Sequence, residues 1–130
     1  MSFSEYEYPP LAFVDIETTG SHFERDRITE VGIKSLVDDR VEIWESLINP
    51  QTFIPQNIQS LTGIRPQMVS NQPPFEGLAT EIARELEGKI FVAHNARFDY
   101  GFLKASFKRV GIDFKPKVLC TVKLLSLIHI

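Results

Sequence analysis

Short apolar segments alternate with polar turns along the first half of the chain. They predict β-strands over Leu11–Ile16, Ile28–Val37 and Val41–Ile48, and a tight polar turn joins the last two. The segment 51–74 contains four prolines and several short polar runs. It therefore predicts loops with brief helical turns rather than further strands.

The second half of the chain changes to a helical period. Apolar residues on one face predict helices over Phe75–Glu87 and Ala96–Val110, each ended by a glycine. Between them, Ile90–Ala93 predicts a short buried strand, and Val118–Leu124 predicts a fifth strand or the start of another element. Hairpin-linked strands followed by helix, strand and helix indicate an α/β or α+β domain, with helices packed on a mixed sheet.

Length and composition are consistent with this pattern. The chain has 130 residues, 43% apolar and 24% charged, which suits one globular domain with a substantial core. We assign residues 1–10 to a flexible N-terminal lead and residues 11–124 to the domain. No apolar stretch is long enough to span a membrane, and a single cysteine, Cys120, fits a reducing cytoplasm.

Charge is divided unevenly along the chain. Residues 1–88 carry 6 Lys and Arg against 15 Asp and Glu, whereas residues 89–130 carry 8 against 2. The positive charge gathers on and after the second predicted helix. It would either attract phosphate groups or form an ordinary solvated helix face, and charge alone favours the solvated face.

The most informative chemistry follows the first strand. Asp15 and Glu17 are separated by one residue, so a strand points both carboxylates to the same face, beside a turn that Gly20 supports. Neighbouring carboxylates repel each other near a core unless a cation lies between them, and Mg²⁺ and Mn²⁺ prefer such oxygen ligands. The spacing alone is also typical of a strand that frays into an acidic loop.

The flanking residues favour the metal site. One segment is D-I-E-T-T-G at 15–20, and a second is F-V-A-H-N-A-R-F-D-Y-G-F-L at 91–103. Together they resemble the DEDDh-type family of 3′–5′ exonucleases, which contains the epsilon proofreading subunit of bacterial DNA polymerase III and epsilon-like exonuclease domains. The segments 28–33 and 61–64 fit the parts between the two motifs, and the resemblance spans about residues 11–124.

This resemblance implies a ribonuclease-H-like fold and phosphodiester hydrolysis with two Mg²⁺ or Mn²⁺ ions. Asp15, Glu17 and Asp99 match three of the family's four metal carboxylates, so they are the expected catalytic and metal-binding residues. If the strand 90–93 lies next to the first strand, the three acids should meet above the sheet. Asp99 has a second explanation, because acids are favoured in the first turn of a helix. We place it in a solvent-facing first turn.

The resemblance also implies a pocket for the 3′-terminal nucleotide. Its expected residues are Thr18, Thr19, Leu61, Thr62, His94 and Asn95. Thr18 and Thr19 would offer hydroxyl or backbone N–H groups to the terminal 3′-OH or its phosphate. Leu61 would contact the base without distinguishing one base from another. Helix capping by Asn95 and a partly buried His94 explain those two residues equally well. We assign Phe98 and Phe102 to the core rather than to base stacking.

The chain departs from the family after Leu124. The family's third motif carries a histidine general base and the fourth metal carboxylate. Here only 31 residues follow Asp99, and no acid follows His129. Residues 125–130 resemble translated adaptor sequence. We interpret them as a non-native tail on a domain incomplete at its C-terminus, with a genuinely short relative as the alternative. Loss of a general base typically costs about 10²–10⁴ in rate, so this chain should be nearly inactive.

We therefore predict a metal-dependent 3′–5′ exonuclease domain that hydrolyses DNA in the cytoplasm, in proofreading or repair. Its partner would be a single-stranded or frayed DNA 3′ end. A DNA polymerase subunit or a fused GIY-YIG nuclease domain would be further partners in a longer protein. Two alternatives stay open. They are an RNA-directed 3′–5′ exonuclease and a catalytically silent module that binds nucleic acid or docks on a polymerase.

Overall fold

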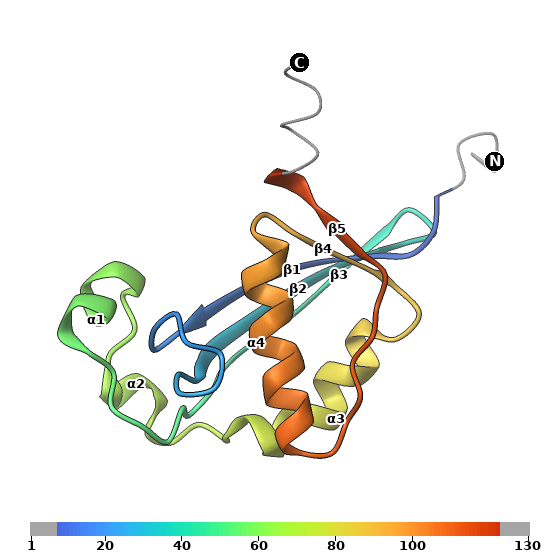
Figure 1. Cartoon of the computed structure of the whole chain (residues 1–130). Helices are drawn as coiled ribbons and strands as arrows, with labels where there is room; N and C mark the ends of the chain where they lie inside the picture. The colour runs from blue at the N-terminus through green and yellow to red at the C-terminus, as the bar shows by residue number, and fades with distance from the viewer. Residues whose placement is uncertain (1–7, 123–130) are drawn as a thin grey trace.

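A five-stranded sheet forms the centre of the computed structural model, which describes residues 8–122 (Figure 1). The strands are β1 (Leu11–Thr18), β2 (Ile28–Val37), β3 (Arg40–Leu47), β4 (Ile90–Ala93) and β5 (Val118–Cys120). The helices are α1 (Gln56–Thr62), α2 (Pro66–Val69), α3 (Phe75–Leu86) and α4 (Ala96–Arg109). The predicted tail, residues 125–130, and most of the predicted lead lie outside the described residues.

The sheet is mixed, as the sequence predicts. Its strand order is β3-β2-β1-β4-β5, in which β1, β2 and β3 are antiparallel neighbours and β4 and β5 run parallel to β1. The segment after Lys117 is a strand over Val118–Cys120, one of the two predicted possibilities. β1 continues two residues beyond the predicted end, so Glu17 lies inside the strand, and the pairing with β2 shifts after Glu17.

The core lies between one face of the sheet and the helices α3 and α4, which cover that face (Figure 1). Val14 and Ile16 on β1 face it together with their partners Ile33 and Val31 on β2. The helices contribute the fully buried side chains of Ile82, Phe102, Leu103 and Phe107. The predicted apolar stripes of the two helices therefore lie on the sheet.

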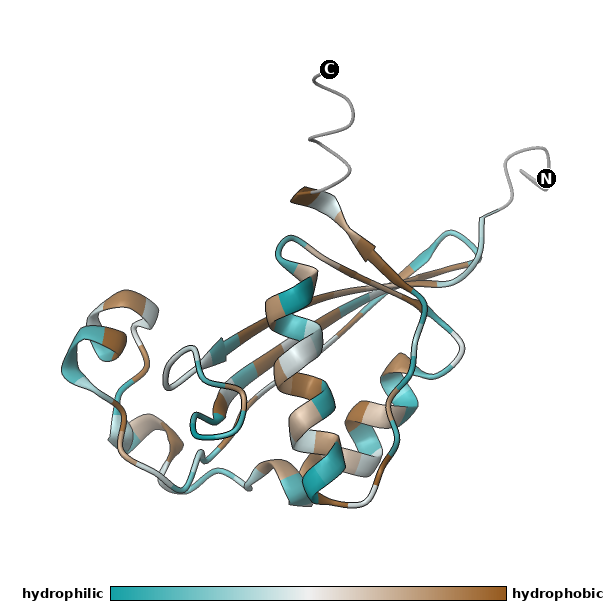
Figure 2. Ribbon diagram, in the orientation of Figure 1, coloured by the Kyte–Doolittle hydropathy of each residue, from teal (hydrophilic) through white to brown (hydrophobic). Residues whose placement is uncertain are grey.

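The hydropathy of β1 changes along its length. Figure 2 shows the strand as hydrophobic over most of its course and hydrophilic towards its C-terminal end. The opposite face of the sheet is exposed at Phe13 (41%) and at Ile43 on β3 (66%). In the described part of the chain, no helix is long and apolar enough to cross a membrane.

Candidate active site

The acidic end of β1 has a free edge on the side of β4. The last residue of β1 that pairs with β4 is Phe13, opposite Val92, because β4 ends at Ala93. The chain then turns into α4, whose first turn carries Asp99. The backbone N–H of Ile16, at this free edge, lies near the Asp99 carboxylate and acts to lower its pKa. The predicted adjacency of the two strands is therefore confirmed, and it brings Asp99 to the acidic end of β1.

Asp99 is buried, with 7% of its surface exposed, so the prediction of a solvent-facing first turn was wrong. The reason is the packing of α4, which holds Ala96 and Leu103 against the sheet and carries Asp99 inward with them. The pKa of Asp99 is raised from 3.8 to about 6, first by burial and then by the charges of Asp15 and Glu17. The backbone N–H groups of Ile16 and of Asp99 itself partly oppose this rise.

A row of carboxylates crosses the exposed face of the sheet. Glu17 on β1 lies directly opposite Glu30 on β2, and Gly32 lies between Asp15 and Glu45 in the register of the three strands. Burial raises the pKa of Glu17, and repulsion from Asp15 and Glu30 adds to the rise. Burial also raises the pKa of Glu30, with Glu45 and Asp15 adding to it. Such a row favours a divalent cation because a cation relieves the repulsion.

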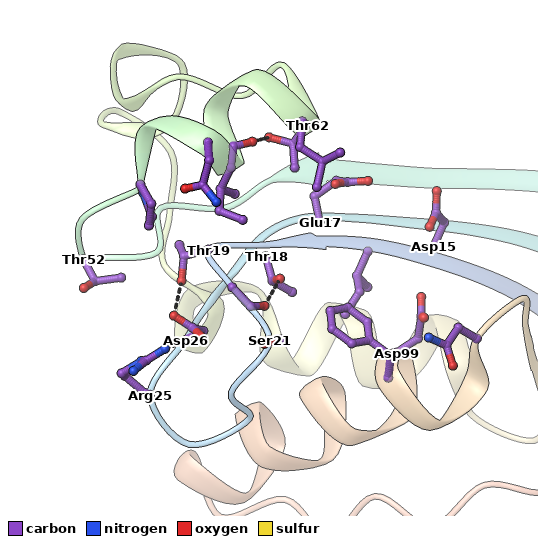
Figure 3. Close-up of a pocket in the computed structure, with 18 of the residues that line it drawn as sticks. Asp15, Glu17, Thr18, Thr19, Ser21, Arg25, Asp26, Thr52, Thr62 and Asp99 are labelled. Carbon is purple, nitrogen blue, oxygen red and sulfur yellow. Dashed lines mark hydrogen bonds and ion pairs between the residues drawn. The ribbon is translucent and has the colours of Figure 1, made fainter.

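The three predicted metal carboxylates flank β1 rather than meeting above the sheet. In Figure 3, Asp15 and Glu17 rise from one side of β1, whereas Asp99 reaches the strand from the side of α4. Within residues 8–122, no three His, Cys, Asp or Glu side chains are close enough together to hold one ion. The carboxylate oxygens themselves suit Mg²⁺ or Mn²⁺. Holding one ion with all three carboxylates therefore requires their side chains to move closer together.

A pocket of about 990 Å³ extends from these acids to α1. It is lined by all six residues predicted for the terminal nucleotide and by the three acids. Leu61 at the end of α1 is 80% exposed, which suits a residue that contacts a ligand rather than the core. Gly63 follows at a φ of 78°, and it ends α1 in the left-handed conformation that glycine adopts without strain.

Both structural explanations offered for His94 and Asn95 were wrong. Asn95 occupies the N-cap position of α4, but its side chain makes no capping hydrogen bond. His94 is exposed, and its Nδ1 lies 3.0 Å from the hydroxyl of Thr121. Both side chains line the pocket, so they are available to a ligand.

Thr18 and Thr19 line the pocket but already use their hydroxyls within the loop that follows β1. The Thr18 hydroxyl donates to the carbonyl of Gly20 at 2.5 Å. The Thr19 hydroxyl lies 3.2 Å from Asp26 Oδ1, and it also accepts a hydrogen bond from the backbone N–H of Arg27 at 3.0 Å. Their role in the structure is to fix the loop, and the predicted contact of these hydroxyls with a 3′ end would compete with that role.

Asp26 organises this loop, and sequence patterns alone do not reveal it. Its carboxylate also accepts a hydrogen bond from the backbone N–H of His22 at 2.9 Å. Burial acts to raise its pKa, but this N–H, the Thr19 hydroxyl and Arg25 outweigh it, so the pKa lies below the usual range. The carboxylate packs so closely on Gly20 that a Cβ there would lie 2.4 Å from it. The loop 19–26 is thus held together by contacts between residues that are several positions apart, and no local sequence motif indicates them.

Aromatic side chains complete the pocket wall. Phe102 is fully buried, as predicted, and Phe98 also packs against the core, but Phe98 is only half-buried and lines the pocket as well. Phe53 lies on the same pocket and is 76% exposed. Its position in a proline-rich segment carries no periodic signal, so sequence patterns could not assign it to the site.

Comparison with known proteins identifies the family. The family model described as RNase_T exonuclease matches residues 12–129, so the chain belongs to this exonuclease family. The protein named 3′-5′ exonuclease DinG of Staphylococcus haemolyticus is 39% identical over 120 residues, which cover 91% of this chain and 13% of that protein. The protein of the same name from Bacillus subtilis is 40% identical over 114 residues, which cover 85% of this chain and 12% of it.

Solved structures of exonuclease I share the fold. The complex of exonuclease I with the SSB C-terminus matches with a TM-score of 0.84 at 18% identity, covering 95% of this chain and 30% of that chain. The complex of Escherichia coli exonuclease I with a dA16 oligonucleotide matches with a TM-score of 0.83 at 18% identity, over 94% of this chain and 30% of that chain. The ribonuclease-H-like fold class is therefore confirmed. This chain spans about an eighth of the length of the DinG proteins that it matches.

Proposed function

We propose that this domain hydrolyses DNA from the 3′ end and that it depends on divalent metal ions. One observation carries the proposal. The three family carboxylates flank the C-terminal part of β1 and all line one pocket that is large enough for a nucleotide. The names of the DinG relatives support the 3′–5′ direction. The exonuclease I complexes with a dA16 oligonucleotide and with single-stranded DNA support single-stranded DNA as the substrate.

Each residue has a defined part in this proposal. Asp15, Glu17 and Asp99 would hold two Mg²⁺ or Mn²⁺ ions. Such ions supply an activated water and stabilise charge at the phosphorus and the leaving oxygen. Leu61 and Phe53 would contact the terminal bases, since their exposed apolar surfaces bind any base without reading its sequence. His94 and Asn95 would approach the terminal nucleotide from the start of α4.

We expect the 130-residue chain by itself to be nearly inactive. Three of the family's four carboxylates are present in the sequence, and His129 has no acid after it. We also propose that the domain works in the cytoplasm, in replication proofreading or repair. A polymerase subunit or a fused GIY-YIG nuclease domain would be its partner in a longer protein. The alternative of a silent binding module is less favourable, because a row of acids repels phosphate unless it holds metal.

Metal binding is tested most directly by calorimetric titration of the chain with Mn²⁺. We expect Asp15→Ala to weaken binding strongly, whereas Glu42→Gln, an exposed carboxylate of β3 outside this pocket, should leave it unchanged. Equal binding by all three proteins would refute the metal site.

Direction and substrate are tested with end-labelled oligonucleotides in the presence of Mg²⁺. We expect mononucleotides to be released from the 3′ end of single-stranded DNA, and more slowly or not at all from RNA of the same sequence. Degradation from the 5′ end would contradict the proposal. Metal binding with no degradation of DNA or RNA by any chain that contains this domain would favour the silent binding module.

A further inference from the structure

A second cleft, of about 410 Å³, opens beside the acidic pocket. Three arginines line it: Arg25 and Arg27 from the loop before β2, and Arg109 from the last turn of α4. The segment after β3 and the start of α3 form its other walls. Arg25 and Thr52 line both hollows, and Figure 3 draws them at the end of the large pocket that is remote from Asp15 and Asp99. The arginine cleft therefore continues the pocket away from the acids.

Two of these arginines are held by backbone carbonyls instead of carboxylates. Arg27 donates from Nη1 to the carbonyls of Glu24, Arg25 and Asp26 at 2.9, 2.9 and 3.0 Å. Arg109 donates from Nη2 to the carbonyls of Phe23 and Glu24 at 2.8 and 3.2 Å. The carbonyls orient both guanidinium groups without neutralising their charge.

The positive charge in the cleft exceeds the negative charge around it. Among residues 8–122, neither Arg27 nor Arg109 forms a salt bridge, and Arg25 pairs only with Asp26 at 3.6 Å while its side chain stays 73% exposed. Burial and the charge of Arg27 both lower the pKa of Arg109, and the Glu24 charge opposes them. Glu76 at the start of α3 is the acidic side chain that lines this cleft.

We propose that the arginine cleft binds backbone phosphates of the nucleic-acid strand whose 3′ end occupies the acidic pocket. This inference rests on the proposed function and adds a second contact point to it. The planar guanidinium group matches the geometry of a phosphate. Apart from Nη1 of Arg27 and Nη2 of Arg109, the guanidinium nitrogens of these two arginines donate to no acceptor among residues 8–122, so they are available to a phosphate. Phosphate contacts carry no sequence information, which suits an enzyme that degrades any sequence.

The cleft also explains how this chain can hold a polyanion. The formal net charge is −3, and the acids at the end of β1 repel a strand without metal. A cationic site in the adjoining cleft supplies affinity away from the acids. The predicted basic helix face is only partly involved, because Arg109 lines this cleft whereas Lys104 and Lys108 line a different hollow.

Binding of fluorescent oligodeoxythymidylate to the full chain, measured by anisotropy with Ca²⁺ present, tests the cleft. An oligonucleotide of roughly 12 residues lies within the range of site sizes for single-strand binding. A dinucleotide serves as the short ligand that reaches only the acidic pocket. The variants are Arg25→Gln, Arg109→Gln and their combination. Lys108→Gln is the matched control, because it removes the same charge from the neighbouring position of α4 but outside the cleft.

We expect the double variant to lose much more affinity for the long oligonucleotide than for the dinucleotide, because Arg25 lies at the end of the large pocket that is remote from Asp15 and Asp99. The slope of log affinity against log salt should fall by roughly 0.7 for each phosphate that the variant no longer neutralises. Glu76→Gln should tighten binding of the long ligand, because it removes a negative charge from the cleft. Thermal melts verify folding, and if Arg109→Gln does not fold, the exposed Arg25→Gln carries the test alone.

Two failures can be distinguished. If the unchanged chain binds neither ligand, the proposed function is wrong. If it binds both, and the double variant keeps the affinity and salt slope of the unchanged chain, only the cleft proposal is wrong. An equal loss of affinity in Lys108→Gln would also overturn the proposal, since it would show a response to net charge rather than to the cleft.

Discussion

Asp99 combines burial with a charge that the folded chain tolerates poorly. Its pKa rises from 3.8 to about 6 in the folded protein, through burial first and then repulsion from Asp15 and Glu17. The folded state therefore holds the proton more tightly than the unfolded state does. The free energy of unfolding of the metal-free protein should fall as the pH rises from about 4 to about 6, by up to about 3 kcal/mol.

Asp99→Asn should remove most of the dependence of the free energy of unfolding on pH. The neutral amide has no charge to desolvate, so the variant should be more stable than the unchanged chain at pH 7 without metal. Urea unfolding between pH 4 and 7 measures the difference, with the exposed Asp113→Asn as control. In the presence of Mn²⁺ the order should reverse, because a deprotonated carboxylate binds metal and an amide does so poorly. A variant that is less stable than the unchanged chain at pH 7 without metal would contradict this explanation.

Removal of two buried hydroxyls on β2 should change the stability of the protein in opposite directions. The Thr29 hydroxyl is buried without a hydrogen-bond partner among the described residues, whereas the Ser35 hydroxyl accepts a hydrogen bond from Lys89 Nζ at 2.9 Å. Thr29→Val keeps the shape and should stabilise the fold by about 1 kcal/mol. Ser35→Ala should destabilise it by a similar amount. Equilibrium urea unfolding at one pH measures both, and a loss of stability in Thr29→Val would show that its hydroxyl has a partner.

At the scale of elements, the spacing of apolar residues along the chain predicted most of the secondary structure. The strand β2 and the helices α3 and α4 agree with the prediction to within a residue, because each buries one regular apolar face. The extension of β1 to Thr18 was not predictable, because it depends on pairing with β2 across an irregular register. The burial of Asp99 was missed for a similar reason, since the direction of a helix's first turn is set by tertiary packing.

The loop before β2 is fixed to α4 by an aromatic contact at Gly101. A Cβ on Gly101 would lie 2.5 Å from the Phe23 ring, which also packs edge-on against Phe102 at a centroid distance of 5.1 Å. Gly101→Ala should therefore displace the ring and destabilise the protein by about 1–3 kcal/mol, although alanine is the better helix former.

The effect of Gly101→Ala on the free energy of unfolding should change sign when the Phe23 ring is absent. In a Phe23→Ala background no ring opposes the new methyl group, so Gly101→Ala should stabilise the helix by about 0.5–1 kcal/mol. Urea unfolding of the four proteins forms a double-mutant cycle that isolates the contact. Additive effects would mean that the ring and the glycine do not touch.

At the scale of the whole molecule, the candidate site could be predicted only in part. Asp15 and Glu17 were predicted because their spacing on one strand occurs within the flanking motif D-I-E-T-T-G, which resembles that of the exonuclease family. The arginine cleft was not, because Arg25, Arg27 and Arg109 lie in two distant parts of the chain and meet only when α4 packs beside the loop. The charge count also misled here, since two of these arginines belong to the acidic part of the sequence.

The two faces of the sheet should respond differently to the same substitution. Ile33 is 1% exposed and pairs with Trp44 on the face covered by α3 and α4, whereas Ile43 is 66% exposed and pairs with Lys34 on the other face. Ile33→Thr shrinks a core side chain and buries a hydroxyl, so it should cost about 2 kcal/mol or more in urea unfolding. Ile43→Thr keeps the β-branched shape on an exposed position and should change stability by less than about 0.5 kcal/mol.

The two substitutions should have opposite effects on the solubility of the chain. Val41 and Ile43 place exposed apolar surface on β3, which is an edge strand and so offers unpaired backbone groups to another molecule. Ile43→Thr should therefore reduce the concentration-dependent light scattering of the folded chain, while Ile33→Thr should increase it by populating unfolded molecules. Unchanged scattering in Ile43→Thr, at the same stability, would show that this face of the sheet does not drive association.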